Sequence, residues 1–351
     1  MSAIKTPDYA VHFGSDGVRA LREVLQKGKF SSVFLIVDSN TARDCLPVLL
    51  KEVPEAAGWE VVTIPAGESH KQIETCMDVW KALSAKGADR SSLVVNLGGG
   101  VVTDLGGFVA STYMRGISFV NIPTSLLAMV DASVGGKTGV DLGTLKNQVG
   151  VINQPELVWV FPDFLDTLSA RETRSGFAEM LKHGLIRDAA YWERLSALSE
   201  PDRSEESIRH SVALKNEVVL ADPTEKNLRK ILNFGHTLGH AIESHFLEGP
   251  NALLHGEAIA MGMILEAYLS TRSLGLDPAA CDHIKQTLVN VFGKPAISEE
   301  DIPPILALLV HDKKNTHGKV LFTLIESPGK AVFNCEVPAK DLQHAFAYYT
   351  E

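Results

Sequence analysis

The chain has 351 residues, 45% of them hydrophobic and 22% charged, and its formal net charge is −10. This length exceeds one ordinary domain and predicts two, and the composition is typical of a globular protein, neither disordered nor membrane-embedded. The acidic charge argues against a nucleic-acid partner, and without a signal peptide or a run of roughly 18 apolar residues we expect a cytoplasmic protein with no membrane partner.

The first half of the chain alternates short apolar runs with longer helical patterns. The apolar runs cover residues 32–38, 60–66, 92–100, 117–125 and 157–161. Continuous apolar runs joined by helices predict a parallel sheet that is covered on both faces.

Beyond about residue 165 helical periods dominate the sequence. They cover residues 171–188, 208–222, 228–246 and 255–272, and only 319–327 is expected to return to a strand or hairpin. The predicted fold class is therefore an α/β, Rossmann-like parallel-sheet domain over residues 1–162, followed by a mostly α-helical domain over residues 163–351.

A glycine run follows the third apolar stretch, where "VVNLGGGVVTDLGGF" places Gly98, Gly99 and Gly100 ahead of a helix expected to begin near Thr103. Ligands of open parallel sheets bind at the carboxyl ends of the strands, and a helix N-terminus favours an anion. We interpret the run as a phosphate or pyrophosphate site, the alternative being a tight turn that needs positive φ. The spacing differs from GxGxxG, so this is not the standard dinucleotide fingerprint.

Other charged residues follow strands or stand among glycines. Asp38 ends the first run and Glu68 and Lys71 follow the second, where a solvated loop charge is the simpler explanation for each. "DASVGGKTGVD" looks like a Walker A loop, but Asp131 occupies a position that needs glycine. Lys137, with Lys146 and Asn147 nearby, still suggests a pocket for an oxyanion or phosphate.

The stretch "NFGHTLGH" carries an unusual polar stripe. Arg229, Asn233, His236 and His240 are spaced four, three and four residues apart, so on a continuous helix they share one face. Apolar neighbours surround them, and buried polar groups need partners, a ligand or a metal. The glycines at 235 and 239 weaken a helix by about 1 kcal/mol each, which predicts that another element packs closely there.

A metal is one explanation for this stripe. The four cysteines lack CxxC spacing, which excludes a disulfide framework and a thiolate zinc site, so histidines and carboxylates must be the ligands. Glu179 and Lys182 share a helix face, and His255 begins another apolar helix. One glutamate and two histidines make a catalytic zinc set, but spacing alone leaves open which two histidines bind, and an ordinary core histidine remains the alternative.

Taken together, the motifs resemble the 3-dehydroquinate synthase family of sugar-phosphate cyclases. The resemblance rests on "GGGVVTDLGGF", "YMRG", "PTSLLAMVDASVGGKTGVD", "KNQVG", "SGFAEMLKHG", "LNFGHTLGHAIE", "HGEAIAMGM" and "HDKKN", which follow in order from about residue 38 to 320. It implies an NAD-dependent enzyme of the shikimate pathway that uses zinc, with cobalt as a further candidate metal, in an N-terminal nucleotide-binding domain and a helical C-terminal domain.

The resemblance also implies roles for individual residues. The zinc ligands are Glu179, His236 and His255, so that His240 faces the substrate instead. Contacts to the sugar phosphate come from Asp131, Lys137, Asn147, Lys182, Lys215, Arg229, Asn233, His240 and either Lys313 or Lys314. Arg115 reaches the substrate of a neighbouring subunit, which implies a homodimer. The NAD contacts are Asp38, Glu68, Lys71, Gly99, Gly100, Asp104, Thr124, Ser125, Leu127, Lys146 and Thr167.

By the same resemblance, 3-deoxy-D-arabino-heptulosonate 7-phosphate is oxidised, loses phosphate, is reduced and closes by an intramolecular aldol step, so NAD is recycled. Two residues depart from the family pattern, Thr103 where glycine is common and Asp141 where asparagine is usual. The alternatives are a cyclase for another sugar phosphate, a zinc-dependent polyol dehydrogenase of the glycerol dehydrogenase type, and a nucleotide-binding protein without catalysis.

Overall fold

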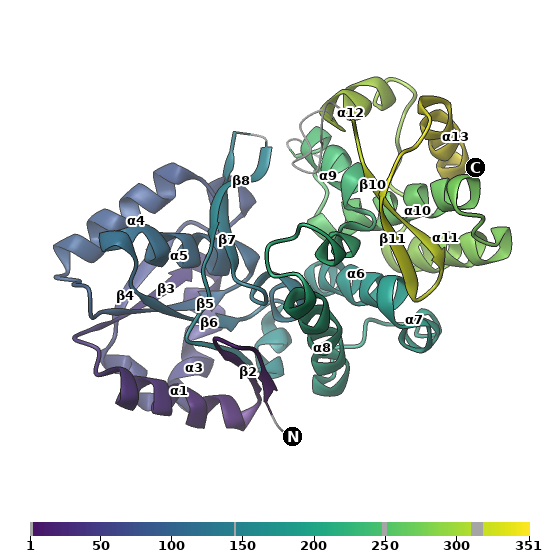
Figure 1. The fold of residues 1–351 in the computed structure, drawn as a ribbon. Coiled ribbons are helices and arrows are strands. Elements are labelled where there is room, and N and C mark those ends of the chain that lie inside the picture. Colours follow the sequence, from purple (N-terminus) through teal and green to yellow (C-terminus); the bar gives the residue numbers. More distant parts are fainter. Residues whose placement is uncertain (1–2, 144, 248–250, 310–318) are drawn as a thin grey trace. The chain divides into compact units, whose positions relative to one another are not determined.

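The computed structural model describes residues 3–143, 145–247, 251–309 and 319–351 (Figure 1). The chain divides into two compact units. The first unit comprises Met1–Thr173 and Arg203–Asn216, and the second comprises Arg174–Asp202 and Glu217–Glu351. The helical segment 203–216 therefore belongs with the sheet, although it lies well beyond residue 162 in the sequence.

The first unit is built on a seven-stranded sheet in the order β1-β2-β9-β6-β5-β3-β4. Its strands are β1 Ile4–Lys5, β2 Ala10–Phe13, β3 Val33–Asp38, β4 Glu60–Ile64, β5 Leu93–Gly98, β6 Ser118–Pro123 and β9 Leu157–Val160. Only the edge pair β1 and β2 is antiparallel; the other pairs are parallel. The five apolar runs all form strands, as predicted, whereas β1 and β2 were not predicted.

Helices cover both faces of this sheet, with α4 and α5 on one side and α1 and α3 on the other (Figure 1). The α-helices of this part of the chain are α1 Ser15–Gly28, α2 Ser39–Asp44, α3 Leu46–Glu52, α4 Ile73–Ala85 and α5 Gly100–Thr112. Shorter helical turns are η1 Pro54–Gly58, η2 Glu68–His70, η3 Tyr113–Arg115, the π-helix η4 Ala128–Ala132 and η5 Pro162–Thr167. Phe34, Val94 and Phe119 of the sheet pack with Val79 and Leu105 of α4 and α5, which buries apolar surface on the α4/α5 side.

An antiparallel hairpin, β7 Lys137–Leu142 and β8 Leu145–Ile152, follows η4. The sequence did not predict it, because Gly135, Gly136 and Gly143 interrupt the period-two pattern by which strands are identified. The hairpin carries Lys137 at its start and Lys146 and Asn147 on its second strand, so it places residues of the predicted site.

The second unit is mostly helical, as predicted. The remaining helices of the chain are α6 Ala170–Arg187, α7 Ala189–Ser196, α8 Glu205–Ala221, η6 Leu228–Asn233, α9 His236–His245, α10 His255–Ser273, α11 Pro278–Phe292, α12 Ile302–Leu308 and α13 Ala339–Thr350. The region 319–327 contains a strand, as predicted: β10 Phe322–Ser327, which forms a hairpin with β11 Lys330–Cys335 beyond the predicted range. Within the described residues, each helix is too short or too polar to cross a membrane.

The predicted continuous helix over 228–246 is wrong. A 3-10 helix ends at Asn233, and α9 begins at His236 after Gly235, whose φ of 79° lies in the left-handed region. Arg229 and Asn233 therefore do not continue the helical face that carries His236 and His240. The glycine supplies the conformation that breaks the helix, which side-chain periodicity could not reveal.

The expected close packing around the glycines is confirmed, and the partner is α10. A Cβ added at Gly235 would lie 2.4 Å from Met263 Cγ, and one at Gly239 would lie 2.8 Å from Ile259 Cδ1. In the opposite direction, a Cβ at Gly262 would lie 1.9 Å from the carbonyl oxygen of Gly235. The backbones of α9 and α10 thus approach as closely as glycine allows.

Candidate active site

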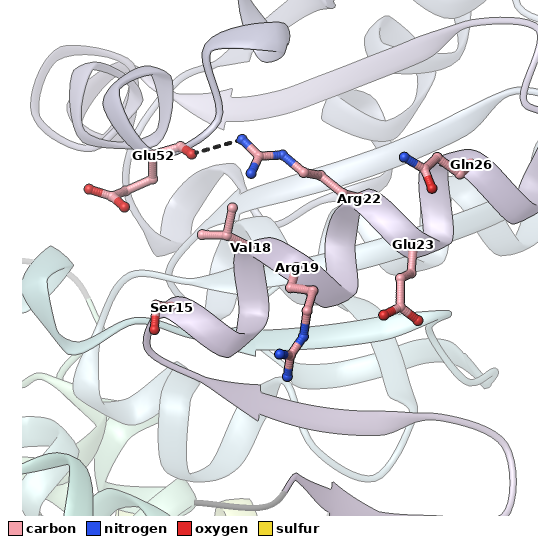
Figure 2. Close-up of a pocket in the computed structure, with 7 residues that line it drawn as sticks. All are labelled: Ser15, Val18, Arg19, Arg22, Glu23, Gln26 and Glu52. Carbon is pink, nitrogen blue, oxygen red and sulfur yellow. Dashed lines mark hydrogen bonds between the residues drawn. The ribbon is translucent and has the colours of Figure 1, made fainter.

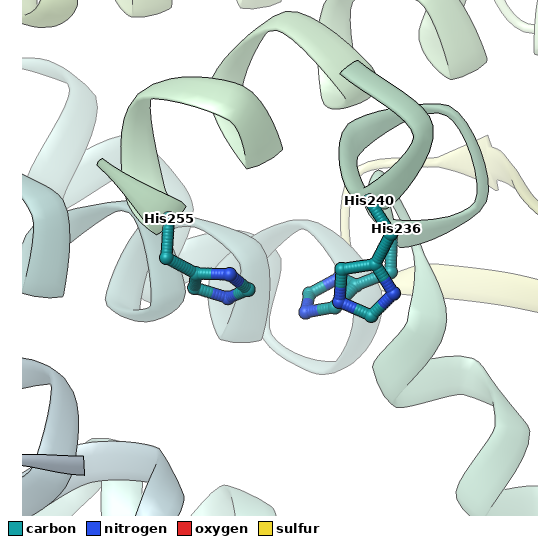
Figure 3. A group of neighbouring side chains, drawn as sticks. All are labelled: His236, His240 and His255. Atoms are coloured by element: carbon teal, nitrogen blue, oxygen red, sulfur yellow. The ribbon is translucent and has the colours of Figure 1, made fainter. Parts of the chain in front are cut away.

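Three helices of the second unit bring one glutamate and three histidines together. Oε1 of Glu179, on α6, lies 3.5 Å from Nε2 of His236 and 3.7 Å from Nε2 of His255. The side chains of His236, His240 and His255 face one another from the starts of α9 and α10 (Figure 3), and their nitrogens lie within 4.8 Å of one another. Glu179 is fully buried. The donor set is that of a catalytic zinc site, two histidines and one carboxylate, with His240 beside it.

The nitrogens on the far side of the two histidine rings are also held. Nδ1 of His236 lies 3.0 Å from the carbonyl oxygen of Phe234, and Nδ1 of His255 lies 3.1 Å from Oε2 of Glu243. With these oxygens as acceptors for Nδ1–H, each Nε2 would be available to a metal ion bound beside Glu179. A backbone carbonyl or a carboxylate on the second nitrogen is the usual outer arrangement around metal-ligating histidines, so the residues fit a divalent metal ion.

The electrostatics of this cluster also suit a cation. Burial lowers the pKa of His236 well below its usual range, and the positive charges of Lys182, His240 and His255 lower it further, so this ring is neutral. Burial also lowers the pKa of His255, but the carboxylates of Glu243 and Glu179 outweigh it and raise the pKa to about 10. The cluster therefore attracts a positive charge next to its two carboxylates.

Lys182 lies one turn beyond Glu179 on α6 and forms an ion pair with it, as their shared helix face predicted. Helix α6 also contacts the start of α10. The hydroxyl oxygen of Ser175 on α6 accepts a hydrogen bond from the N–H of Gly256 on α10 at 2.9 Å. A Cβ at Gly256 would lie 2.1 Å from the Ser175 carbonyl oxygen, so α6 packs directly against the start of α10.

Arg229 and Asn233 lie in the irregular segment before α9. Arg229 is 2% exposed and donates from Nη1 to the carbonyl oxygen of Pro223 at 2.8 Å. Asn233 donates from Nδ2 to Oε1 of Glu225 at 2.8 Å. Asp222 accepts backbone N–H groups from Lys226, Asn227 and Arg229 at 3.1, 2.7 and 3.1 Å. Burial raises the pKa of Asp222, but these donors outweigh it and lower the pKa overall.

Asp222, Glu225 and Glu243 were not predicted from the sequence. In the sequence, Asp222 and Glu225 look like ordinary charged residues near the end of a predicted helix, and Glu243 looks like a residue on the polar face of α9. The signal for the first two was "DPTEKN", in which proline and asparagine mark an irregular segment whose backbone needs side-chain acceptors. Only tertiary contact identifies Glu243.

In the first unit, Lys215 and Asp131 meet although they are far apart in the sequence. Lys215 donates to Oδ1 of Asp131 at 2.7 Å and to its backbone carbonyl at 2.5 Å.

Lys137, which opens β7, is exposed. Arg115 is exposed too and lies in a turn where Met114, Arg115 and Gly116 have φ values of 50°, 72° and 112°. Such strain in residues other than glycine points to a functional constraint.

A buried network of charges brings together several residues assigned to NAD. Lys71 donates to Oδ2 of Asp104 and to Oδ1 of Asn147, both at 2.6 Å, and Lys146 donates to Oε1 of Glu68 at 2.5 Å. Burial lowers the pKa of Lys71, but the surrounding carboxylates of Asp104, Glu68 and Asp141 raise it overall. The pKa of Asp104 is raised by burial, which here exceeds the opposite effect of Lys71.

Asp141, one of the two departures from the family pattern, joins this network. Its Oδ1 accepts the backbone N–H of Asn147 at 2.6 Å, and its Oδ2 lies 3.7 Å from Nζ of Lys146. Burial raises the pKa of this carboxyl, and the two lysines of the network lower it by less. The other departure, Thr103, is buried in α5 and donates to the carbonyl oxygens of Gly99 and Gly100, so it has a helical role.

The remaining NAD candidates lie at or after the carboxyl ends of strands. The glycine run does not form a turn with positive φ, and α5 begins at Gly100 instead of near Thr103. A Cβ at Gly99 would lie 3.2 Å from Ser125 Oγ, whereas one at Gly100 would meet Ala132 Cβ at 3.6 Å. Because Gly99 and Gly100 carry no side chains, their own residues do not shield the backbone N–H groups at the start of α5, which suits a phosphate.

Asp38 and the other strand-end residues are placed as follows. Asp38 caps α2 by accepting the N–H groups of Asn40 and Thr41 at 2.9 and 2.8 Å. Thr124 and Ser125 follow β6, Leu127 precedes η4 and Thr167 ends η5. The NAD roles of these residues stay predictions, and Lys313 and Lys314 lie outside the described residues.

A hollow of about 530 Å³ lies elsewhere on the first unit, along α1 (Figure 2). Ser15, Val18, Arg19, Arg22, Glu23, Gln26 and Glu52 line it. Arg22 in this hollow is already paired with Glu55 at 2.6 Å, and the lining contains none of the predicted site residues. We therefore assign the chemistry to the clusters above and not to this hollow.

Known proteins resemble the whole chain. A family model described as "3-dehydroquinate synthase N-terminal" matches residues 61–175, and one described as "3-dehydroquinate synthase C-terminal" matches residues 176–315. A 3-dehydroquinate synthase of Parabacteroides distasonis is 38% identical over 94% of this chain and 95% of its own length.

Solved structures agree with the fold. The 2-epi-5-epi-valiolone synthase ValA of Streptomyces hygroscopicus, with NAD⁺ and Zn²⁺ bound, has a TM-score of 0.85 at 28% identity and covers 100% of this chain and 99% of its own. A 2-deoxy-scyllo-inosose synthase complexed with carbaglucose-6-phosphate, NAD⁺ and Co²⁺ has a TM-score of 0.84 at 24% identity, covers 98% of each chain and supports the fold alone.

Proposed function

Because the chain belongs to the 3-dehydroquinate synthase family, we propose that it converts 3-deoxy-D-arabino-heptulosonate 7-phosphate to 3-dehydroquinate and phosphate. It is a lyase of the shikimate pathway, which makes precursors of the aromatic amino acids. In this proposal the NAD site belongs to the first compact unit, which extends past the predicted boundary at residue 162 and includes residues 203–216, and the metal site belongs to the second unit.

The observation that carries the proposal is the convergence of Nε2 of His236 and of His255 on one buried oxygen of Glu179. We assign Glu179, His236 and His255 as the ligands of a divalent metal, zinc or cobalt. The metal supplies a Lewis acid that lowers the pKa of a coordinated hydroxyl group. Phe234 and Glu243 contact Nδ1 of the two imidazoles, which would leave both Nε2 atoms available to hold the ion.

The nucleotide site of the proposal lies in the first unit. The start of α5 at Gly99 and Gly100 receives the pyrophosphate, and Lys71 and Lys146 supply positive charge. NAD supplies reversible removal and return of a hydride, so the overall reaction consumes no cofactor. Asp104 and Glu68 hold the side chains of these two buried lysines in place through ion pairs.

The substrate is an anion with a carboxylate and a phosphate, and the remaining polar residues bind and orient it. Arg229 is planar, always charged and fixed by Pro223, so it is suited to bind one of these groups. Lys182 and Asn233 are fixed by Glu179 and Glu225, while His240 adjoins the metal ligands. Asp131, Lys137, Asn147 and Lys215 are the other residues that the proposal assigns to the substrate. Catalysis by these residues is mainly orientation and charge stabilisation.

A homodimer and a cytoplasmic location are also part of the proposal. The support for the homodimer is Arg115, an exposed arginine held at a φ of 72°, which would serve the substrate site of a neighbouring subunit. Sedimentation of the wild-type protein tests the dimer. Arg115→Ala is expected to lower kcat/KM while leaving the metal content unchanged.

A second candidate is a cyclase for a different sugar phosphate. The similarity to ValA favours it, since a relative that makes 2-epi-5-epi-valiolone has nearly the same fold over the full chain. The two candidates share the metal and NAD chemistry and differ only in the preferred substrate. A polyol dehydrogenase would instead release NADH in proportion to product.

The test mixes metal-loaded protein with the heptulosonate 7-phosphate and sub-stoichiometric NAD⁺, and follows phosphate and 3-dehydroquinate. Many turnovers per NAD⁺, abolished by a chelator and by Glu179→Ala, are expected. Gly58→Ala serves as the matched control, because an added Cβ there meets nothing within 4 Å. Metal and NAD⁺ binding without this product, but with turnover of another sugar phosphate, would transfer the assignment to the second candidate.

A further inference from the structure

Two buried glutamates that are not among the proposed ligands hold the beginnings of the helices that carry the histidines. His236 is the first residue of α9 and His255 is the first residue of α10. Glu243, near the end of α9, contacts Nδ1 of His255 at 3.1 Å. Glu266, on α10, accepts the backbone N–H of Gly235 at 2.6 Å and that of Leu238 at 3.1 Å. Each helix therefore supplies a carboxylate to the first turn of the other.

Both carboxylates lie in places where a charge is costly. Glu243 is 5% exposed and Glu266 is fully buried. A buried charge costs several kcal/mol unless hydrogen bonds compensate it. Glu266 lies at the N-terminus of α9, where the positive end of the helix dipole favours an anion. Glu243 accepts a hydrogen bond from the His255 imidazole.

The helix pair leaves these contacts little freedom. Gly235, Gly239 and Gly262 let the two backbones approach so closely that a Cβ at Gly262 would lie 2.7 Å from the N atom of Gly239. Packing at this density is not continuously deformable, so a carboxylate that crosses from one helix to the other fixes both helix starts. The direction in which each histidine leaves its helix follows from that geometry.

We propose that Glu243 and Glu266 are positioning residues for the metal centre and form a reciprocal brace, defined here as Glu243 on His255 and Glu266 on the start of α9. Glu243 selects the His255 tautomer with Nδ1–H and makes its Nε2 a stronger ligand. Glu266 fixes the left-handed turn at Gly235 and with it the path of His236. This inference rests on the metal ligands of the proposed function.

A merely structural role makes a different prediction. If the glutamates only hold α9 and α10 together, removing their charge lowers the melting temperature of the metal-free protein and leaves metal binding intact. If they position the histidines, zinc affinity falls and the ligand field changes. Loss of an outer partner of this kind typically weakens metal binding by about 10- to 100-fold.

The experiment compares Glu243→Gln and Glu266→Gln with wild type and with Asp188→Asn. Asp188 is a matched control because it also accepts a backbone N–H at a helix start, from Tyr191 at 3.0 Å, but on α7 and away from the ligands. Zinc affinity is measured by competition with a chromophoric chelator, the ligand field by the visible spectrum of the Co²⁺ form, and folding by melting of the metal-free protein.

The expected result is an affinity about 10- to 100-fold weaker for both glutamine variants, a shifted Co²⁺ spectrum, and wild-type values for Asp188→Asn. Wild-type zinc affinity and an unchanged spectrum in both variants would overturn the brace, whatever happens to the melting temperature. Should Glu266→Gln not fold, Glu266→Asp replaces it, with a smaller loss of affinity in the same direction expected and wild-type affinity again counting against the brace.

The same data separate this inference from the proposed function. If wild type binds no zinc tightly, or if Glu179→Ala retains its affinity, the metal assignment itself fails. If wild type and Glu179→Ala behave as assigned and only the two glutamine variants are indistinguishable from wild type, the ligands stand and the brace does not.

Discussion

Gly262→Ala tests how strictly the α9/α10 contact controls this protein. The added methyl group would lie 1.9 Å from the carbonyl oxygen of Gly235, well below the 3.4 Å at which ordinary van der Waals contact begins. Both clashing partners, this oxygen and the N atom of Gly239, belong to the backbone, so neither can rotate away. We therefore take the upper part of the overpacking range, about 3 kcal/mol.

Alanine is also a better helix former than glycine by about 1 kcal/mol, which acts in the opposite direction. The net expectation is a loss of about 2 kcal/mol in the free energy of unfolding, together with zinc affinity at least tenfold weaker, because metal–ligand distances tolerate only about 0.2 Å. Urea denaturation of the metal-free protein measures the first quantity, and chelator competition measures the second.

Gly58→Ala is the control, since its methyl group meets nothing within 4 Å, and a change within about 0.5 kcal/mol is expected for a site of that kind. A Gly262→Ala protein that keeps both wild-type stability and wild-type zinc affinity would refute the reasoning. It would mean that α9 and α10 separate at no cost and that their spacing does not set the ligand geometry.

Three further predictions concern the buried charges. Asp141→Asn keeps an acceptor but removes a carboxylate whose pKa is raised by burial. Wild type loses stability as the pH rises from the ordinary aspartate pKa of about 4 through the raised pKa, so the variant's advantage in thermal melting should grow as the pH is raised above about 4. Asp222→Ala removes the acceptor of three backbone N–H groups and should lower the free energy of unfolding in urea by about 1–3 kcal/mol. KM should rise, because one of these N–H groups belongs to Arg229. An unchanged KM would show that the turn held by Asp222 does not affect substrate binding. Lys71→Met leaves Asp104, whose side chain is 16% exposed, without its cation. It should cost up to about 3 kcal/mol in urea denaturation, less than for a fully buried pair, and weaken NAD⁺ binding measured by calorimetry. Normal NAD⁺ binding would remove Lys71 from the nucleotide site.

Much of the fold could be predicted from the sequence because it depends on local periodicity. Five uninterrupted apolar runs all became strands of the parallel sheet, and the helices around Glu179 and His255 lie close to their predicted bounds. Such patterns predict the structure well because a strand buried on both faces, or a helix with one apolar face, has few other ways to remove its apolar surface from water.

The sequence also identified the candidate metal-binding residues and the glycine run, through residue types and motif order. It could not choose among the histidines by spacing, and it wrongly placed Arg229, Asn233, His236 and His240 on one helix. Gly235 could have been read either as a helical glycine or as a break, because only its backbone conformation, φ 79°, distinguishes the two.

Tertiary structure decided everything that depends on contacts between distant segments. It showed that Glu179 meets His236 and His255 at one oxygen, and that Glu243 and Glu266 cross between α9 and α10. No local signal encodes these contacts, since a glutamate has the same side chain whether it faces water or caps another helix. The sequence by itself determined which chemistry the chain can carry; the packing of α6, α9 and α10 decided which atoms meet, because close packing permits only one arrangement of the ligands.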